Sequence, residues 1–242
     1  MLSPYGYVYN YGMNVIALHE WHVTTAQANE IQLRLASQIS RAGNIVNPRF
    51  IAGADISVNK FAKTGTGAVV VLSYPELEMV EVQVVTDRIE FPYVPGLLTF
   101  REAPLVLAAF EKLTLRPDAL IVDGQGIAHP RRIGLASHLG LLLGLPTIGC
   151  AKSRLLGEYR EPDSAAGSFS DLLDDDEIIG AALRTRAGIK PVFVSIGHRI
   201  DLPSAIRWTL ACCRGYRIPE PLRLAHQAAG GYLGEKSRYK IQ

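Results

Sequence analysis

Three acidic residues lie where apolar segments of the chain end or where a helix begins. Asp123 ends a short apolar run, Asp55 lies within the apolar segment 50–57, and Glu102 lies at the start of a helical pattern. Carboxylates brought together repel one another unless a cation joins them, and hard oxygen ligands suit Mg²⁺ or Mn²⁺. Such a metal can activate water and stabilise the leaving oxygen of a phosphodiester. A shared metal site is therefore one interpretation of these residues.

Each of these residues also has a purely structural interpretation. Asp55 alone could form a turn or a cap, and Glu102 could be a favourable partner for the positive end of a helix. The linear sequence does not establish that the three carboxylates converge. The acidic run 174–177 is interpreted as a solvated part of a loop over 158–177, not as a metal site.

The segment 120–152 predicts the elements that would position Asp123. It reads as strand, loop, helix and strand, which is a βαβ unit. Ligands of an open α/β sheet bind at the carboxyl ends of its strands, and Asp123 lies at such an end. An α/β fold with a mixed central β-sheet flanked by helices is expected, with three antiparallel strands before the βαβ unit. The other predicted strands are 50–57, 67–74, 79–87, 178–184 and 191–196.

Helices are predicted at three further places. Thr24 or Thr25 can cap a helix over 25–42, whose apolar positions recur at helical spacing. Thr99 can cap a helix that carries Glu102 in its first turn. A third helix over 202–213 is entered through an aspartate and a proline.

The bulk properties exclude several classes of protein. The 242 residues predict a single domain over 1–242, with an irregular arm at 1–20 and a frayed basic tail at 236–242. A net charge of +2 decides neither for nor against nucleic acid. No apolar run reaches the roughly 20 residues of a membrane span, so no membrane is expected. The N-terminus does not resemble a signal peptide, and three cysteines suit a reducing cytoplasmic location.

A tyrosine lies between two prolines in the segment 91–96. Pro92 and Pro95 stiffen the chain around Tyr93, so the aromatic side chain is held on an extended loop. One interpretation is a surface loop whose tyrosine folds back onto the core. The other is a wedge that enters a base stack or holds two strands apart.

Six segments of the chain, in this order, resemble the Endonuclease V family, the inosine-specific repair nucleases. The segments are IAGADIS (51–57), PYVPGLLTFREAP (92–104), LIVDGQGIAHPRRIGLASHLG (120–140), PTIGCAKSRLLGEY (146–159), VSIGHRIDL (194–202) and RIPEPLRLAH (217–226). The resemblance implies an RNase H-like fold with a mixed five-stranded central sheet. It also implies Mg²⁺-dependent cleavage, with Mn²⁺ substituting, of the second phosphodiester bond 3′ to deoxyinosine or inosine. The products would carry a 3′-hydroxyl and a 5′-phosphate.

The resemblance also implies roles for five residues in catalysis. Asp55, Glu102 and Asp123 match the metal-binding carboxylates of the family. His198 matches its active-site histidine, with a satisfied loop histidine as the alternative. Lys152 matches a lysine near the scissile phosphate, where a positive charge would stabilise the transition state, and ordinary loop charge is its alternative.

The implied substrate contacts lie in two motifs. Pro92, Tyr93 and Pro95 match the strand-separating wedge. Gly96, Leu98, Gly124 and Gly126 match the lining of a hypoxanthine pocket, where small residues let backbone amides approach the base. Gln125 departs from many members of the family, which leaves its role open, and the acidic loop 163–177 matches no motif.

Two other functions stay open at the level of the sequence. One is an RNase H-like nuclease for branched or otherwise damaged DNA, which would use the same carboxylates with a different pocket. The other is a non-catalytic inosine-binding protein, although a pure binder gains nothing from carboxylates that face phosphate. The expected partner is nucleic acid, either inosine-containing DNA or RNA, and the expected state is a monomer.

Overall fold

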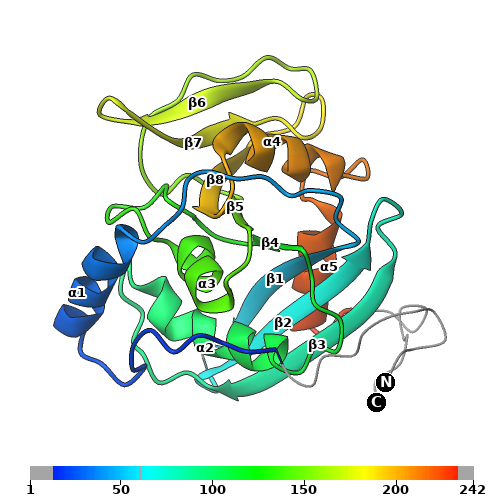
Figure 1. Cartoon of the computed structure of the whole chain (residues 1–242). Coiled ribbons are helices and arrows are strands. Elements are labelled where there is room, and N and C mark those ends of the chain that lie inside the picture. Colours follow the sequence, from blue (N-terminus) through cyan, green and yellow to red (C-terminus); the bar gives the residue numbers. More distant parts are fainter. Residues whose placement is uncertain (1–12, 60, 234–242) are drawn as a thin grey trace.

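Residues 13–59 and 61–233 are described by a computed structural model of the chain. Within these ranges, eight strands form one sheet in the order β3-β2-β1-β4-β5-β8-β7-β6 (Figure 1). The strands are β1 Phe50–Asn59, β2 Thr64–Ser73, β3 Met79–Arg88, β4 Ala119–Val122, β5 Thr147–Ala151, β6 Phe169–Asp174, β7 Glu177–Leu183 and β8 Val192–His198. The helices are α1 Thr25–Ala36, α2 Leu98–Phe110, α3 Leu135–Leu143, α4 Leu202–Ala211 and α5 Glu220–Ala229.

The sheet is mixed, as the sequence predicts. β1 pairs antiparallel with β2 and parallel with β4, and β4 pairs parallel with β5. The predicted βαβ unit is β4-α3-β5. Because β1, β4 and β5 run in the same direction, their carboxyl ends lie at one edge of the sheet. The sheet extends past the five strands that the family resemblance implies, through the antiparallel strands β8, β7 and β6.

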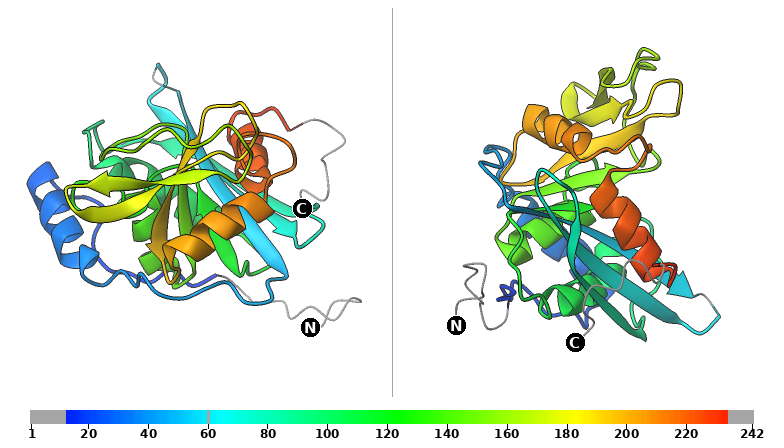
Figure 2. Two further views of the ribbon diagram at one scale, coloured as in Figure 1. Left: turned by 90° about the horizontal axis from the view of Figure 1, so that it is seen from above. Right: turned by 90° about the vertical axis from the view of Figure 1, so that its right-hand side faces the viewer.

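Helices cover both faces of the sheet (Figure 2). Successive residues of a strand point to opposite faces, so Ile51 packs with residues of α4 and α5, whereas Ala52 packs with residues of α2 and α3. Both faces of the central strands are therefore buried, which explains their nearly continuous apolar sequences. Among the helices of the described residues, none combines the length and the apolar character of a membrane span.

The first helix begins where the sequence predicts and ends earlier. Thr24 and Gln27 form a capping box at the start of α1, but the helix stops at Ala36, not at residue 42. The backbone N–H of Ser40 donates to His198 Nδ1 at 3.2 Å, and the Ser40 carbonyl accepts from Arg199 N–H. The Ser40 N–H and carbonyl therefore bond to His198 and Arg199, not to other residues of a continuing helix.

Other predictions need correction. The segment 158–177 is not only a loop, because β6 lies within it and pairs with β7. The predicted cap Thr99 lies inside α2 and is buried, since Leu97 occupies the cap position. Helix α5 was not predicted. Of the predicted N-terminal arm 1–20, residues 13–20 form no helix or strand and residues 1–12 lie outside the described residues, as does the predicted tail 236–242.

Candidate active site

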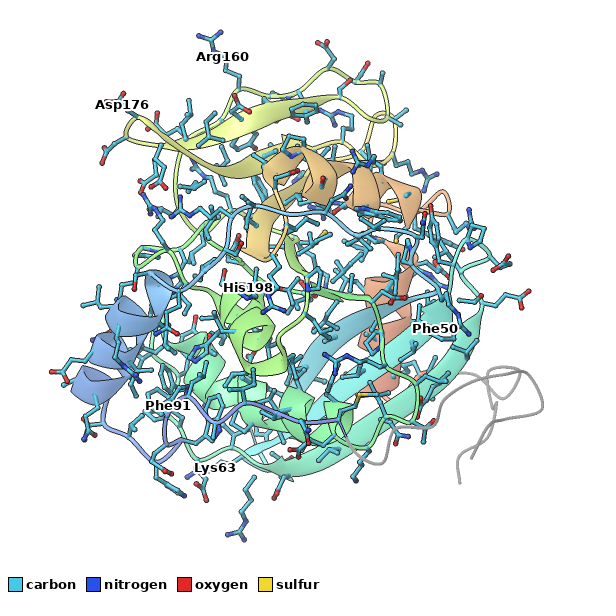
Figure 3. All side chains as sticks on the ribbon, in the orientation of Figure 1. Phe50, Lys63, Phe91, Arg160, Asp176 and His198 are labelled. Carbon is cyan, nitrogen blue, oxygen red and sulfur yellow. The ribbon has the colours of Figure 1, made fainter. Side chains whose placement is uncertain are left out.

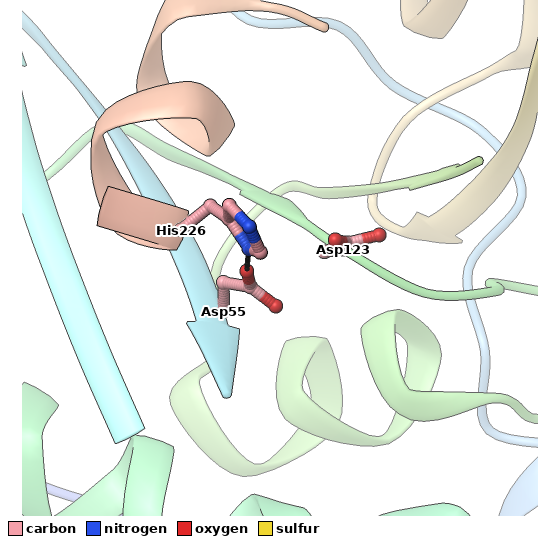
Figure 4. A group of neighbouring side chains, drawn as sticks. All are labelled: Asp55, Asp123 and His226. Atoms are coloured by element: carbon pink, nitrogen blue, oxygen red, sulfur yellow. Dashed lines mark hydrogen bonds and ion pairs between the residues drawn. The ribbon is translucent and has the colours of Figure 1, made fainter. Parts of the chain in front are cut away.

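Asp55 and Asp123 lie side by side because parallel neighbouring strands carry them. Ala54 of β1 pairs with Val122 of β4, and the Asp123 N–H donates to the Ala54 carbonyl at 3.0 Å. His226 of α5 completes the group, with its Nδ1 atom 2.6 Å from Asp55 Oδ2 (Figure 4). One ligand atom from each of Asp55, Asp123 and His226 lies within 4.8 Å of the others.

A close approach between β1 and α5 brings His226 to this group. A Cβ atom at Gly53 would lie 2.2 Å from the carbonyl carbon and oxygen of Pro221, so only glycine allows the helix backbone to lie against the strand here. His226 is in the last turn of α5, and Pro221 is at the beginning of the same helix. The glycine two residues before Asp55 therefore positions the histidine that contacts Asp55.

Glu102 of α2 lies close enough to Asp55 and Asp123 for their charges to act on it. Burial, and then the charges of Asp55 and Asp123, raise the pKa of Glu102 to about 7. Burial and the charge of Asp123 also raise the pKa of Asp55, although the hydrogen bond from His226 and the charge of Lys152 oppose this rise. The structure thus places Asp55 and Asp123 together and Glu102 near enough for their charges to act on it, although Glu102 is not part of the group within 4.8 Å.

Lys152, which directly follows β5, also lies beside Asp123. Its Nζ atom forms an ion pair with Asp123 Oδ2, and its side chain is 42% exposed. The pair is open to solvent on the lysine side, so Lys152 can exchange its partner for a phosphate oxygen at little cost. One site therefore receives Asp55 from the middle of β1, and Asp123 and Lys152 from just beyond the carboxyl ends of β4 and β5.

This donor set fits a divalent cation. Asp55, Asp123 and Glu102 offer hard carboxylate oxygens, and His226 offers one ring nitrogen. Mg²⁺ and Mn²⁺ bind carboxylate oxygens and keep other coordination positions for water or substrate. Burial is the largest cause of the raised pKa of Glu102, and the charges of the two aspartates add to it. A cation would offset those charges, so the electrostatics of the site and its donor chemistry agree.

His198 lies at the other end of the sheet from this group. It pairs with Thr147, and Thr147 pairs with Leu120 at the start of β4, whereas Asp123 follows the end of β4. Its side chain packs against α3, because a Cβ atom at Gly140 would lie 2.4 Å from His198 Cβ (Figure 3). The structure does not bring His198 to the carboxylates, so we exclude it from the candidate site.

His198 instead has a satisfied structural environment. Its Nδ1 atom accepts the Ser40 N–H, and burial lowers its pKa to about 4, so the ring is neutral. This matches the alternative interpretation of a satisfied histidine. The histidine beside the carboxylates, which the sequence interpretation overlooked, is His226, the last residue of the motif RIPEPLRLAH. Pro219, Glu220 and Pro221 at the start of this motif are typical of a helix start, and a helix there would have suggested a second position for a site histidine.

The proline-flanked tyrosine is presented to solvent. The Tyr93 side chain is 72% exposed, and Pro92 and Pro95 are also exposed. The alternative in which Tyr93 folds back onto the core is therefore wrong. The loop lies directly before α2, the helix that carries Glu102.

The residues matched to a base pocket have different environments. Gly96 has φ +78 and accepts hydrogen bonds at its carbonyl, whereas Leu98 is half-buried at the start of α2. Gly124 is partly exposed and directly follows Asp123. Gly126 packs tightly on β8, because a Cβ atom there would lie 1.9 Å from the Ile196 carbonyl oxygen. Gly126 thus holds the loop against the sheet. The Gln125 side chain donates to the Ser153 carbonyl at 3.1 Å, which links the Asp123 loop to the Lys152 loop.

The mixed sheet and the carboxylates at its edge define an RNase H-like α/β protein with an acidic site. Residues 33–227 match the family model described as Endonuclease V. The chain is 54% identical over 229 residues to Endonuclease V of Gloeobacter violaceus, covering 93% of this chain and 92% of the relative. The chain belongs to the Endonuclease V family, a family of nucleases.

Two solved structures support the same assignment. Endonuclease V of Streptomyces avermitilis matches with a TM-score of 0.84 and 41% identity, over 93% of this chain and 99% of that chain. Endonuclease V of Ciona intestinalis, in complex with a 24mer DNA containing an inosine followed by a ribo-adenosine, matches with a TM-score of 0.73 and 31% identity. That match covers 86% of this chain and 96% of the other.

Proposed function

We propose that this protein is a metal-dependent endonuclease that recognises deoxyinosine or inosine in nucleic acid. It hydrolyses the second phosphodiester bond on the 3′ side of that base, leaves a 3′-hydroxyl and a 5′-phosphate, and acts in the repair of deaminated bases. The observation that carries the proposal is the group of Asp55, Asp123 and His226 within 4.8 Å, in a chain of this family. The inosine-containing DNA bound by the Ciona relative supports the choice of substrate.

The cofactor we propose is Mg²⁺, with Mn²⁺ able to substitute. Asp55, Asp123 and Glu102 would supply oxygen ligands, and His226 holds Asp55 through the 2.6 Å contact or binds on its own account. When bound, such a cation supplies an activated water and charge stabilisation for an oxygen that leaves phosphorus. The residues themselves fix the orientation of the carboxylates, because Asp55 is buried and bonded on one oxygen to the Ile56 N–H.

Lys152 would contribute a positive charge at the reacting phosphate. Its ammonium group is paired with Asp123 in the structure, and it is exposed enough to meet a phosphate oxygen. Negative charge accumulates on the phosphate oxygens in the transition state, and a fixed cation stabilises it there more than in the ground state. Lys152 therefore has a catalytic role in this proposal.

Tyr93 would open the duplex so that the target base leaves the stack. An aromatic side chain held between two prolines loses little conformational freedom when it enters a base stack. Removing a base from a duplex costs a few kcal/mol, and a wedge that fills the vacated space offsets part of that cost. Pro92 and Pro95 would keep the tyrosine extended.

The flipped base would be read near Gly96, Leu98 and Gly124, with Gly126 fixing the loop. Hypoxanthine lacks the exocyclic amino group of guanine, so a tight wall near C2 excludes guanine. It differs from adenine by a 6-oxo acceptor and an N1–H donor, so backbone donors at O6 and an acceptor at N1 reject adenine. Discrimination of this kind is strong because a wrong base leaves buried polar groups unpaired.

We also propose that the protein acts as a monomer in the cytoplasm. Cys150, Cys212 and Cys213 are all free, which agrees with a reducing compartment. Burial raises the pKa of each of the three thiols, so none of them is activated as a thiolate.

Cleavage of end-labelled oligonucleotides tests the proposed function. Substrates carry one deoxyinosine in DNA, one inosine in RNA, or neither, and reactions contain Mg²⁺, Mn²⁺ or EDTA. The proposal predicts a metal-dependent cut at the second phosphodiester 3′ to the modified base, with no cut in the unmodified strand. The DNA-to-RNA rate ratio then defines the working substrate.

The same experiment separates the other functions. Cleavage of unmodified flaps or junctions without preference for inosine would support the nuclease for branched DNA and contradict the base pocket. Tight binding to inosine-containing strands without cleavage in either metal would support a binding protein and contradict the catalytic site.

A further inference from the structure

The exposed loop 92–95 is fastened at both of its ends. On one side, the Phe91 carbonyl accepts a hydrogen bond from Arg101 at 2.9 Å. On the other side, three side chains donate to the Gly96 carbonyl. They are Gln32 at 3.1 Å, His129 at 3.0 Å and Arg131 at 2.8 Å. Pro92, Tyr93 and Pro95 are exposed, whereas Val94 is half-buried against the cluster of Phe91, Leu97 and Phe100. The tyrosine is thus held by contacts on both sides of it.

The protonation state of His129 makes it a donor in this group. Burial, and then the charges of Arg131 and Arg132, lower its pKa to about 4, so the ring is neutral at physiological pH. Its Nδ1 atom accepts the Arg131 N–H at 3.2 Å, which leaves the proton on Nε2 for the Gly96 carbonyl. Three donors therefore converge on one carbonyl oxygen.

Gln32 is the member of this group that comes from α1, outside the loops of the site. Its side chain is fully buried, and both ends of the amide are used. Oε1 accepts from Arg131 Nε at 2.5 Å, and Nε2 donates to the carbonyls of Gly96 and Ile133, at 3.1 and 3.4 Å. Gln32 therefore orients the guanidinium of Arg131 and at the same time holds Gly96.

The packing of α1 does not by itself require a buried glutamine. Leu35 of the same helix packs with Ile133 and Leu141 and attaches α1 to the domain. Burying an amide costs free energy that its hydrogen bonds must offset, whereas an apolar side chain of the same size has no such cost. The distinctive effect of Gln32 is that it joins the end of the exposed loop to the loop of Arg131.

We propose that Gln32 is a positioning residue for Tyr93, because it fixes the loop 92–95 through Gly96 and Arg131. The proposal rests on the function proposed above, in which Tyr93 separates the strands of a duplex. Strand separation is needed when the target base is paired and stacked, and much less when the substrate is single-stranded. Loosening the loop should therefore impair cleavage of duplex substrates selectively.

The test compares Gln32→Met with the wild type on two substrates. kcat/KM is measured with Mg²⁺ on a deoxyinosine-containing duplex and on the same strand without its complement. We expect Gln32→Met to lower kcat/KM on the duplex about tenfold and on the single strand less than about twofold. The change removes the charge-assisted hydrogen bond from Arg131 and the hydrogen bonds to the Gly96 and Ile133 carbonyls. Gln38→Met is the matched control, because Gln38 is exposed just beyond α1 and should leave both rates unchanged.

A second variant protects the test against simple misfolding. Gln32→Glu keeps an acceptor for Arg131 Nε but removes the donor to the Gly96 carbonyl, so it should retain the fold and still show the selective loss on duplex. Thermal unfolding of every variant is followed in parallel. If both Gln32 variants lower the two rates equally, or neither rate changes, the proposal is overturned.

A double-mutant cycle with Tyr93→Ala tests whether Gln32 acts through the tyrosine. If it does, Gln32→Met causes little further loss on duplex once Tyr93 is removed. Fully additive losses would contradict the proposed route. Failure of the proposed function gives a different result, because the wild type itself would then cut neither inosine-containing substrate.

Discussion

The acidic residues at 174–177 and the group of Asp55, Glu102 and Asp123 are built in opposite ways. Arg132 donates to Asp174 at 2.7 Å and to Glu177 at 2.6 Å, and Arg41 also pairs with Glu177. Hydrogen bonds from Arg41 and Arg132 lower the pKa of Glu177, whereas burial and neighbouring carboxylates raise the pKa of Glu102 to about 7.

This difference separates a structural cluster from the proposed metal site. Arginines pair with Asp174 and Glu177, and these ion pairs attach the β6–β7 hairpin to the rest of the molecule. Where the carboxylates lie close to one another and the charges of Lys152 and Arg101 do not balance them, the protein retains a repulsion that an added cation relieves. Acidic composition alone does not distinguish the two groups, because the run at 174–177 is the denser of them in sequence.

The largest expected effect is the loss of cleavage in Asp123→Asn. The change removes a charged ligand and the partner of Lys152, so we expect kcat/KM for inosine cleavage to fall about a thousandfold or more. Glu177→Gln is the matched change in the arginine-paired cluster and should reduce the rate less than about threefold. Similar losses in the two variants, measured by initial rates on one duplex substrate, would remove the distinction between the clusters.

The two histidines provide a second contrast. His226→Ala should lower kcat/KM by about ten- to a hundredfold, because Asp55 loses the side chain that orients it. His198→Ala should change the rate less than about threefold and lower thermal stability instead, since His198 is buried and bonded to Ser40 N–H. If His198→Ala were the variant that abolished cleavage while remaining folded, the assignment of His226 would be wrong.

The pH dependence of stability should have opposite signs in the two clusters. The folded pKa of Glu102, about 7, lies above its ordinary value, so in metal-free protein its ionisation destabilises the fold as pH rises through this range. Glu102→Gln should remove this decline, a change of about 2 kcal/mol after discounting for the partial exposure of Glu102. Glu177 has a lowered pKa, so its contribution is present at neutral pH and is lost on acidification.

Denaturant unfolding from pH 4 to pH 8 in EDTA measures both contributions. A Glu102→Gln profile that runs parallel to the wild-type profile between pH 5 and 7 would contradict the raised pKa of Glu102. For Glu177→Gln, the difference from the wild type should be largest at neutral pH and should shrink toward pH 4.

The smallest expected effect concerns Arg132. Arg132→Met removes both ion pairs to the β6–β7 hairpin, and partly exposed pairs of this kind contribute about 1 kcal/mol. We expect a small loss of unfolding free energy and faster hydrogen exchange in β6, with inosine cleavage changed less than about twofold. A large loss of cleavage in a folded Arg132→Met protein would place the arginine-paired cluster in the functional site.

The strands and the central helix were predictable because their signals are local. The segment 120–152 contains an apolar strand, a turn and an apolar helix in direct succession, and the structure confirms β4, α3 and β5 there. The end of α1 was not predictable from helical periodicity, because Ser40 is withdrawn from the helix by contacts with His198 and Arg199, more than 150 residues further along the chain.

The site was only partly predictable for the same reason. Asp55 and Asp123 could be placed together once two strands were predicted to end near them. His226 reaches Asp55 across 171 positions of sequence, and it does so because Gly53 lets α5 lie against β1. Neither the approach of that helix nor the distance of His198 from the carboxylates is encoded in local spacing. The family resemblance pointed to His198, whereas the tertiary packing places His226 beside Asp55 and Asp123.

The most direct test of the central claim is calorimetric titration with Mn²⁺ of metal-free wild-type protein, Asp123→Asn and Glu177→Gln. The account predicts that the wild type and Glu177→Gln bind Mn²⁺ alike, with release of protons near pH 7 from Glu102, and that Asp123→Asn binds at least about tenfold more weakly. Equal Mn²⁺ binding by all three proteins would contradict the claim that the unbalanced carboxylates form the metal site.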